Sequence, residues 1–279
     1  MKRGDTIDQE YLRITASTIE HDMYAHPDEH YFRDCYLYWI FRTLDKFLSA
    51  EEDSHLSLLD IGCGQGRLTI PTAKKFDRII STGVDLSEPA IMQARENSRT
   101  EGVENRCFFE NCEALKWTKN LGSETQNVIF LNEVVFYAHD YLSLIEEAFR
   151  ILKPEGIAFI SFRSRYFNLA HIVKNKTFDK ITQVLQSNQG ELFGKGLTFS
   201  WHDQSESTQI LSQYGFEVMD NLGIGIFSGL TGDPMADWCS PSSLDSDQRK
   251  KLFELETNVA REYANSARYI LSIVTKTNS

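Results

Sequence analysis

The sequence predicts an α/β fold with a mostly parallel sheet, and two patterns support this. Between Ser57 and Phe162, apolar runs such as LSLLDIG, IISTGVDLS, CFFEN, NVIFLNEV and GIAFISF alternate with amphipathic stretches. Strand and helix signals that alternate in this way are typical of βαβ units. The helix boundaries agree, because Ser87 followed by Pro89 suits a helix start and LKPEG at 152–156 ends a helix.

The segments that flank these units predict a helical cap and a lid. Residues 1–55 contain YFRDCYLYWIFRTLDKFL, which suits a largely buried helix, and we expect them to form an N-terminal helical cap. Residues 164–200 fit no further βα unit and end in the glycine-rich QGELFGKGLTF, so they predict a lid inserted after the fifth strand. The core would then comprise residues 56–163 and 201–279.

Asp203 marks the predicted start of a helix after the lid. Glu206 follows three residues later, as in a capping box, and Gly215 stands where the helix would end. Two further strands are predicted at GFEVMD and RYILSIVTK.

Composition and charge narrow the possible functions. The 279 residues are 41% hydrophobic and 25% charged, as in ordinary globular proteins. The net charge of -11 predicts no nucleic-acid partner, because binding to phosphates draws on Lys and Arg. No apolar run approaches the roughly 18 residues of a membrane span, so we expect no membrane partner and a cytoplasmic location. The five cysteines form no CxxC pair and predict neither a metal site nor a disulfide framework.

A glycine-rich turn, LLDIGCGQG, is the strongest functional signal. Gly62, Gly64 and Gly66 follow an apolar run that ends at Asp60. Such a turn lets backbone N–H groups approach a ligand closely and suits an anionic or strongly polar ligand group. The dinucleotide fingerprint would require a third glycine where Arg67 stands, which argues against NAD.

A second acid, Asp85, ends the next apolar run in GVDLS, where a carboxylate can accept both hydroxyls of a ribose. Together, LLDIGCGQG, GVDLS, FFENCEALKW, NVIFLNEVVFYAHD and RILKPEGIAFISF resemble the ordered motifs of class I S-adenosylmethionine (SAM)-dependent methyltransferases. The resemblance implies a Rossmann-like fold, with a seven-stranded, mostly parallel sheet of order 3-2-1-4-5-7-6 and helices on both faces. Its last strand would be antiparallel. SAM would be the cofactor and S-adenosylhomocysteine the product.

The resemblance also implies contacts to the cofactor. Asp60 and the three glycines would surround the methionine portion, Asp85 would hold the ribose, and Leu86 would lie against the adenine. Asn111 stands where the family often has an acid that faces the adenine amino group. Cys112 would offer its backbone N–H to the ring.

Four further residues are implied to lie near the other end of the cofactor. Leu131 and Asn132, at the end of the fourth strand, would flank the sulfonium. Family members often fold an N-terminal segment over the cofactor with a Tyr or Arg near its carboxylate, and Tyr24 and Arg33 are the candidates here.

Side chains just beyond the fourth and fifth strands are candidates for contact with the acceptor. His139 and Tyr137 are the predicted catalytic residues, acting as a base or orienting the acceptor, since His titrates near neutral pH. The alternative is that His139 only caps or packs a helix start. We interpret Arg163 and Arg165 as a solvent-facing pair; the alternative is bidentate binding of an acidic substrate group.

The sequence therefore predicts a SAM-dependent methyltransferase that moves a methyl group by in-line displacement to an O or N nucleophile of a small-molecule acceptor. The aromatic cap and the lid predict a closed pocket, which favours a small acceptor. DNA methylation is disfavoured because the fourth strand ends in LNEVV, without an Asn-Pro-Pro-Tyr-like or Pro-Cys motif. The alternatives are a methyltransferase acting on proteins, a SAM-binding protein without catalysis, and an NAD-dependent oxidoreductase.

Overall fold

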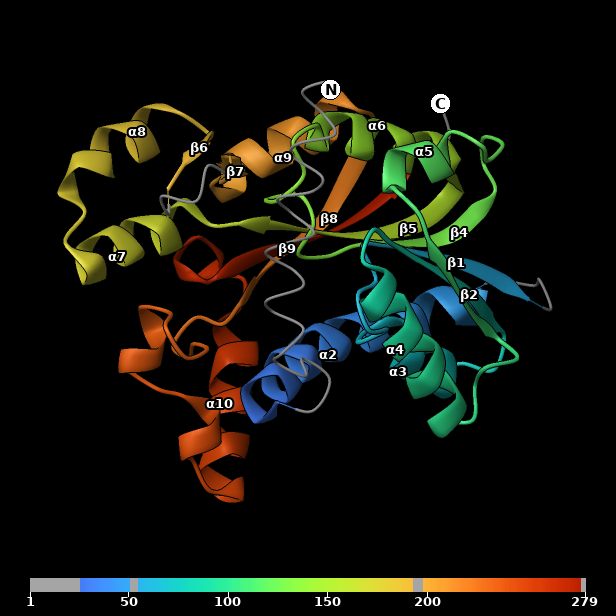
Figure 1. The fold of residues 1–279 in the computed structure, drawn as a ribbon, viewed down its shortest axis with the longest axis horizontal. Helices are drawn as coiled ribbons and strands as arrows, with labels where there is room; N and C mark the ends of the chain where they lie inside the picture. Colours follow the sequence, from blue (N-terminus) through green and yellow to red (C-terminus); the bar gives the residue numbers. More distant parts are fainter. Residues whose placement is uncertain (1–25, 51–54, 193–197, 277–279) are drawn as a thin grey trace.

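The computed structural model describes residues 26–50, 55–192 and 198–276 of the chain. Its main sheet has seven strands in the order β3-β2-β1-β4-β5-β9-β8 (Figure 1). The strands of this sheet are β1 (Leu56–Ile61), β2 (Ile79–Asp85), β3 (Cys107–Asn111), β4 (Gln126–Leu131), β5 (Leu152–Arg163), β8 (Phe216–Ile224) and β9 (Tyr269–Lys276).

The predicted topology of the main sheet is confirmed. Two short strands, β6 (Gln189–Glu191) and β7 (Thr198–Ser200), form a separate sheet within the predicted lid. Without these two, the strand order is 3-2-1-4-5-7-6. Strands β1 to β5 pair in parallel, and β9 is antiparallel to both β5 and β8.

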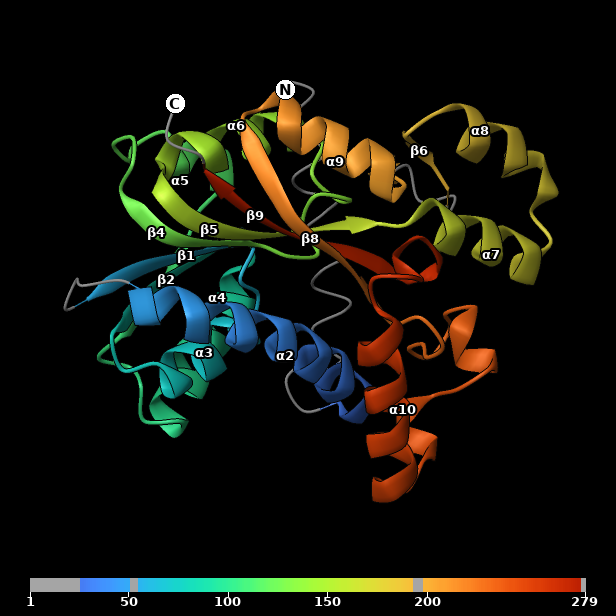
Figure 2. The ribbon, with the colours of Figure 1, turned by 180° about the vertical axis from the view of Figure 1, so that it is seen from behind.

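Helices cover both faces of the sheet (Figures 1 and 2). One face carries α2 (Pro27–Ala50), α3 (Thr69–Lys75), α4 (Glu88–Thr100) and α10 (Ser246–Val259). The other face carries α5 (Ala114–Thr118), α6 (Tyr141–Ile151) and α9 (Gln204–Gln213). Among the helices of the described ranges, none has both the length and the apolar character needed to cross a bilayer.

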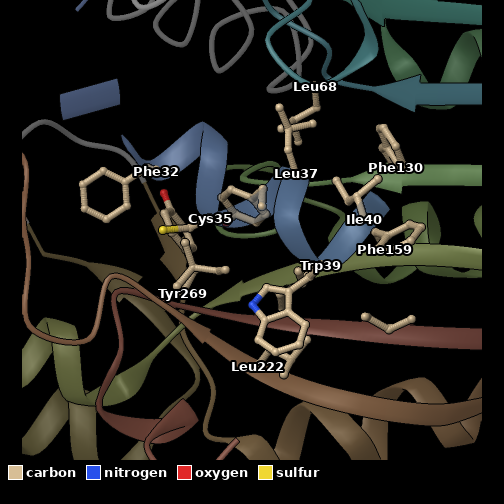
Figure 3. Close-up of a cluster of buried hydrophobic side chains, with 14 of the residues drawn as sticks. Phe32, Cys35, Leu37, Trp39, Ile40, Leu68, Phe130, Phe159, Leu222 and Tyr269 are labelled. Atoms are coloured by element: carbon tan, nitrogen blue, oxygen red, sulfur yellow. The ribbon is translucent and has the colours of Figure 1, made fainter. Parts of the chain in front are cut away.

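Helix α2 is part of the main hydrophobic core. Tyr36, Ile40 and Leu44 recur at four-residue spacing and are fully buried, as expected for one face of a helix. They belong to a cluster that includes Phe130 of β4 and Phe159 of β5. Figure 3 shows side chains of α2, Ile40 among them, pointing toward these strands. Each such buried side chain contributes about 1.5–3 kcal/mol, so α2 is held firmly against this face of the sheet.

Alternation along β5 decides which side chains reach which face. Ala158, Ile160 and Phe162 belong to the cluster beneath α6, whereas Phe159 belongs to the cluster beneath α2. Because successive side chains in a strand point to opposite faces, Ser161 and Arg163 lie on the α2 face. The carboxyl end of β5 therefore places polar side chains beside α2.

The segment predicted as a lid leaves the sheet after β5 and returns beside the same point. It contains α7 (Arg165–Asn175), a 3-10 turn (Phe178–Lys180), α8 (Ile181–Gln186), β6 and β7. His202 donates its backbone N–H to the carbonyl of Arg163, so the two ends are tied together. Beyond it, the predicted capping box of Asp203 and Glu206 starts α9.

Candidate active site

The glycine turn after β1 adopts backbone angles that favour glycine at all three positions. The φ angles of Gly62, Gly64 and Gly66 are +74°, +51° and +80°. A Cβ atom at Gly62 would collide with Val134, and one at Gly66 would lie 2.6 Å from Ile70 Cδ1. A Cβ at Gly64 would meet no atom within 4 Å. Packing therefore requires the outer two glycines, whereas Gly64 faces open space that a ligand can approach.

The backbone donors of this turn are already used within the protein. Gly62 and Cys63 both donate to the carbonyl of Val84, at 2.7 and 3.1 Å, and Gly66 donates to the carbonyl of Cys63 at 2.9 Å. Gly64 donates to Oδ2 of Asp85 at 2.9 Å. The turn thus offers a ligand close approach to its backbone, but these four N–H groups are not the free donors that the sequence led us to expect.

Asp85, at the end of β2, is held in place by backbone donors. Its Oδ1 accepts from the N–H of Ser87 at 2.8 Å, and its Oδ2 accepts from Gly64. Burial raises the pKa of Asp85, and the backbone donors of Ser87, Gly64 and Leu86 oppose that rise. Since each carboxylate oxygen has a second lone pair, the fixed carboxylate can still accept hydrogen bonds from two ligand hydroxyls.

A cavity opens beside this turn and brings together six of the residues predicted from sequence. They are Gly62, Asp85, Leu86, Cys112, Tyr137 and His139. Apolar side chains, among them Val134, Leu144 and Phe199, form much of the remaining wall. The cavity thus combines an acidic end at β2 with an aromatic and imidazole end after β4.

Asp60 and Asn111 lie outside the cavity lining. Asp60 is buried beneath the turn and accepts from the hydroxyl of Thr69 at 2.5 Å. Burial raises the pKa of Asp60 to about 7, although the Thr69 hydrogen bond opposes the shift. The side-chain NH₂ of Asn111 donates to the carbonyls of Asp85 and Leu86, which leaves the Asn111 side-chain oxygen as its acceptor.

Two other residues predicted to contact the cofactor have partners within the protein. The N–H of Cys112 donates to the carbonyl of Asp85 at 3.0 Å, because the ladder between β2 and β3 continues one residue past β3. It is therefore not a free donor for an adenine ring, and Cys112 lines the cavity by other atoms. Arg33 pairs with its neighbour Asp34 at 2.8 Å and does not line the cavity. Tyr24 lies outside the described residues.

Asn132 stands out among the predicted residues because its amide is buried without a partner. It follows Leu131, a fully buried residue at the end of β4, and it is 6% exposed. Neither its Nδ2 nor its Oδ1 forms a hydrogen bond with the described residues. An unmatched buried amide costs about 1–3 kcal/mol, so such a group in a native site calls for a ligand or a functional reason.

A buried ion-pair network on the α2 face was missed by the sequence reasoning. Arg67 bonds Oε2 of Glu29 at 2.5 Å and Oε1 of Glu133 at 2.7 Å. Burial pushes the pKa of Glu133 up, but the charges of Arg67 and Arg268 outweigh it and hold that pKa below its ordinary value. The sequence analysis used Arg67 only as the residue that replaces the third glycine of the dinucleotide fingerprint. The residues next to it in sequence do not indicate that its partners lie in α2 and after β4.

The interpretation of Arg163 and Arg165 as a solvent-facing pair is wrong. Arg163 is 7% exposed, because the alternation of β5 turns it toward α2. Arg165 begins α7 and bonds Asp203 at 3.1 Å and Glu206 at 2.6 Å, the two residues of the α9 capping box. Arg165 thus forms structural ion pairs, whereas Arg163 is buried beside the site.

Comparisons with known proteins agree with this arrangement. A family model described as a methyltransferase domain matches residues 52–215. The tRNA 5-carboxymethoxyuridine methyltransferase of Escherichia coli O157:H7 is 24% identical over 236 residues, which cover 83% of this chain and 84% of that protein. The mitochondrial ubiquinone biosynthesis O-methyltransferase of Bos taurus is 28% identical over 44% of this chain and 32% of its own.

The fold comparison points the same way. A solved SAM-dependent methyltransferase from Methanosarcina mazei superposes with a TM-score of 0.55 at 15% identity, covering 84% of this chain and 98% of that one.

The residues present fit SAM. Gly64 faces open space, the Asp85 carboxylate has lone pairs to offer, and the Asn132 amide is unpartnered. The family match spans more than half of the chain. The chain therefore belongs to the methyltransferase domain family and is a SAM-dependent methyltransferase.

Proposed function

We propose that this methyltransferase acts on an oxygen or nitrogen nucleophile of a small-molecule acceptor. The observation that carries the proposal is the cavity, which runs from the glycine turn and Asp85 to Tyr137, His139 and Phe199. Much of its wall is apolar, and small-molecule sites are typically concave, mostly apolar and equipped with a few placed polar groups.

In this proposal the cofactor lies along the turn. Asp85 accepts from the ribose hydroxyls, Leu86 packs against the adenine, and Gly64 allows the methionine portion to approach the backbone. SAM, when bound, supplies a methyl group that its sulfonium already activates. The protein then has to align the acceptor with that group and exclude water, which the apolar walls do.

His139 and Tyr137 act on the acceptor. Both line the end of the cavity that follows β4, within one short loop. His139 takes the proton where the nucleophile must lose one, because a neutral imidazole has one ring nitrogen that can accept a proton. Tyr137 orients the acceptor with its hydroxyl.

A second candidate acceptor is a tRNA nucleoside. It is favoured by the match to the tRNA 5-carboxymethoxyuridine methyltransferase, which covers 83% of this chain. The net charge of -11 opposes it, because the phosphates of tRNA would meet a mostly acidic protein. A protein acceptor remains a third candidate, and peptide turnover without turnover of metabolites would identify it.

The first test is calorimetric titration with SAM, S-adenosylhomocysteine and, as the control, NAD. Saturable binding of the two sulfur nucleotides alone is expected. Methyl transfer from radiolabelled SAM is then measured with a metabolite extract and, separately, with total tRNA before and after ribonuclease treatment. Label in small molecules supports the proposal, whereas label in tRNA alone contradicts it. Binding without any transfer would identify a SAM-binding protein that lacks catalysis.

A further inference from the structure

We propose that Arg163 is the anchor for a carboxylate group of the methyl acceptor. This inference rests on the proposed function, since it names a chemical feature of the acceptor. It concerns binding and orientation of the acceptor on the α2 face, at the carboxyl end of β5.

Aromatic rings enclose the guanidinium of Arg163. The ring centroids of Tyr269, Phe167 and Phe136 lie 4.1, 4.3 and 4.4 Å from its Cζ atom. Its Nη2 donates to the hydroxyl of Tyr269 at 2.7 Å. Its Nη1 is buried and bonds no atom of the described residues. Arg163 is therefore a buried cation with an unused donor.

Two other arginines near Arg163, Arg67 and Arg268, differ from it in having a carboxylate partner. Arg67 bonds Glu29 and Glu133, and Arg268 lies 3.2 Å from an oxygen of Asp233. Within the described ranges, no Asp or Glu comes within 4.0 Å of the Arg163 guanidinium. The acids of this region thus form their ion pairs with other arginines, and Arg163 acts on Glu133 only at longer range, where its charge helps to lower the pKa of that carboxyl.

The energetics of this arrangement favour an anionic ligand. Moving a cation out of water carries a large free-energy cost even after the protein relaxes. Stacking against aromatic rings offsets part of that cost and leaves the positive charge in place. A carboxylate offers charge-assisted hydrogen bonds, the strongest neutralising partner for a guanidinium. The free Nη1 is the donor that such a ligand would use first.

The position of Arg163 connects it with the cavity. The Phe136 ring that covers Arg163 lies 3.7 Å from the Tyr137 ring and 6.2 Å from the Phe199 ring, measured between centroids. Tyr137 and Phe199 both line the cavity. The Phe136 ring thus lies against both Arg163 and two residues of the cavity wall, and an acceptor whose reactive end lies in the cavity would bring its carboxylate to Arg163 by extending past this ring.

Asn132 is a second unpartnered polar group near Arg163 in the fold. Leu131 pairs with Ile160 in the parallel register of β4 and β5, so the residues that follow the two strands' last pair lie near one another. Asn132 comes directly after β4, and Arg163 is the last residue of β5. The unpartnered amide of Asn132 and the unpartnered Nη1 of Arg163 thus lie at the carboxyl ends of adjacent strands.

The test compares carboxylic acids with their primary amides, titrated into the protein saturated with S-adenosylhomocysteine. The probes are a panel of aliphatic and aromatic acids, the nucleoside 5-carboxymethoxyuridine, and tRNA that carries this nucleoside. We expect at least one acid to bind about 10- to 100-fold more tightly than its amide, as a charged hydrogen-bonded pair would give. The arm in which the preference appears identifies a free acid or a tRNA as its source.

Three variants assign the preference to the side chain. Arg163→Gln should bind acid and amide equally, and Arg163→Lys should keep part of the preference, because it keeps the charge but loses the planar fork. Arg165→Gln is the matched control, with the preference unchanged, since Arg165 bonds Asp203 and Glu206. For an acid that accepts the methyl group, Arg163→Lys should raise KM more than it lowers kcat.

Two results would overturn the inference. One is a wild-type protein that prefers no acid to its amide in any arm; the other is a preference that survives Arg163→Gln. Affinity for S-adenosylhomocysteine is measured in each variant. Normal affinity shows that Arg163→Gln has folded, whereas lack of affinity in the wild type would count against the proposed function itself.

Discussion

The glycine turn and the arginine cluster occupy neighbouring strand ends, yet they are built in different ways. The turn and its acid use residues 60–66 and 85–87, and most of its polar contacts are backbone N–H bonds to carbonyls or to Asp85. The cluster joins Glu29, Arg67, Glu133, Arg163 and Tyr269, and its contacts are between side chains.

This difference indicates that one region serves mainly ligand binding and the other mainly stability. The shape of the turn depends on backbone conformation, so a ligand can approach the turn without disturbing any ion pair. The cluster depends on opposite charges that compensate one another in a buried region, where an unpaired charge is costly. We therefore expect changes in the cluster to affect folding first, and changes at the exposed edge of the turn to affect cofactor affinity first.

The largest effect is expected for Arg67→Met. This change leaves the carboxylates of Glu29 and Glu133 buried without their cation. Removing one partner of a buried pair costs about 3–5 kcal/mol, because the remaining charge has no compensation. Chemical denaturation should show this loss in the free energy of unfolding.

The matched control for this change is Arg261→Met. Arg261 also bonds a carboxylate, Asp220, at 2.6 Å, but its side chain is 69% exposed. Exposed pairs contribute about 0–1 kcal/mol, so the control should lose little. Equal losses in the two variants would contradict the claim that burial makes the Arg67 network important.

The next largest effect concerns the pH dependence of stability and Asp60. Its pKa of about 7 lies above the ordinary value of 3.8, because burial disfavours the charged form. The folded state therefore keeps a proton that the unfolded chain loses. The stabilising contribution of Asp60 is complete below about pH 4 and is lost as the pH rises to about 7.

Asp60→Asn removes this titration while keeping an oxygen for the Thr69 hydroxyl. The free energy of unfolding of the variant, relative to the wild type, should rise by about 2–4 kcal/mol between pH 4 and pH 7 and stay level above. Denaturant titrations without cofactor at several pH values measure this difference. Asp77→Asn, at a side chain that is 96% exposed, should show no such rise. A flat difference for Asp60→Asn would mean that its pKa is ordinary.

The turn and the cluster also differ in how much of each could be predicted from the sequence. The capping box of Asp203 and Glu206 and the glycine turn depend on neighbours in sequence, so local patterns predicted them. The order of the seven strands was implied by the resemblance to a known family. The burial of Arg163 depends on a ring from β9 that lies 106 residues away. No local pattern contains that information, and charged residues after a strand are usually exposed.

Cys112 shows a further limit. The sequence predicted its place after β3. Whether its N–H donates to the carbonyl of Asp85 depends on how far β2 and β3 stay paired. Propensity does not determine the last pair of a ladder to within one residue. The structure was needed to show that the donor is occupied.

Gly62→Ala and Gly64→Ala separate folding from binding within the turn. Both require a left-handed backbone, which costs about 1–2 kcal/mol for alanine. At Gly62 the methyl group also meets Val134, and overpacking brings the expected loss of stability to about 2–3 kcal/mol. At Gly64 no atom lies within 4 Å, so the loss should stay near 1 kcal/mol while affinity for S-adenosylhomocysteine falls. Thermal unfolding and calorimetry measure the two effects, and the opposite ranking would reverse our assignment of these glycines.

Asp85→Ala tests the turn where it would touch the cofactor, and its effect on stability should be the smallest of the series. The carboxylate accepts from Gly64 and Ser87, next to a cavity, so water can reach those N–H groups after the change. Loss of the ribose contacts should weaken S-adenosylhomocysteine binding by about 10- to 100-fold. Asp85→Asn should fall in between, because one acceptor oxygen remains. Glu113→Gln, at another acid of the cavity wall, should leave the affinity within about twofold if the effect depends on hydrogen-bond geometry rather than on charge alone. If instead the Asp85 and Glu113 variants lost affinity equally, the site would recognise its cofactor by overall charge, and the contrast between a backbone-shaped turn and a charge-built cluster would not hold.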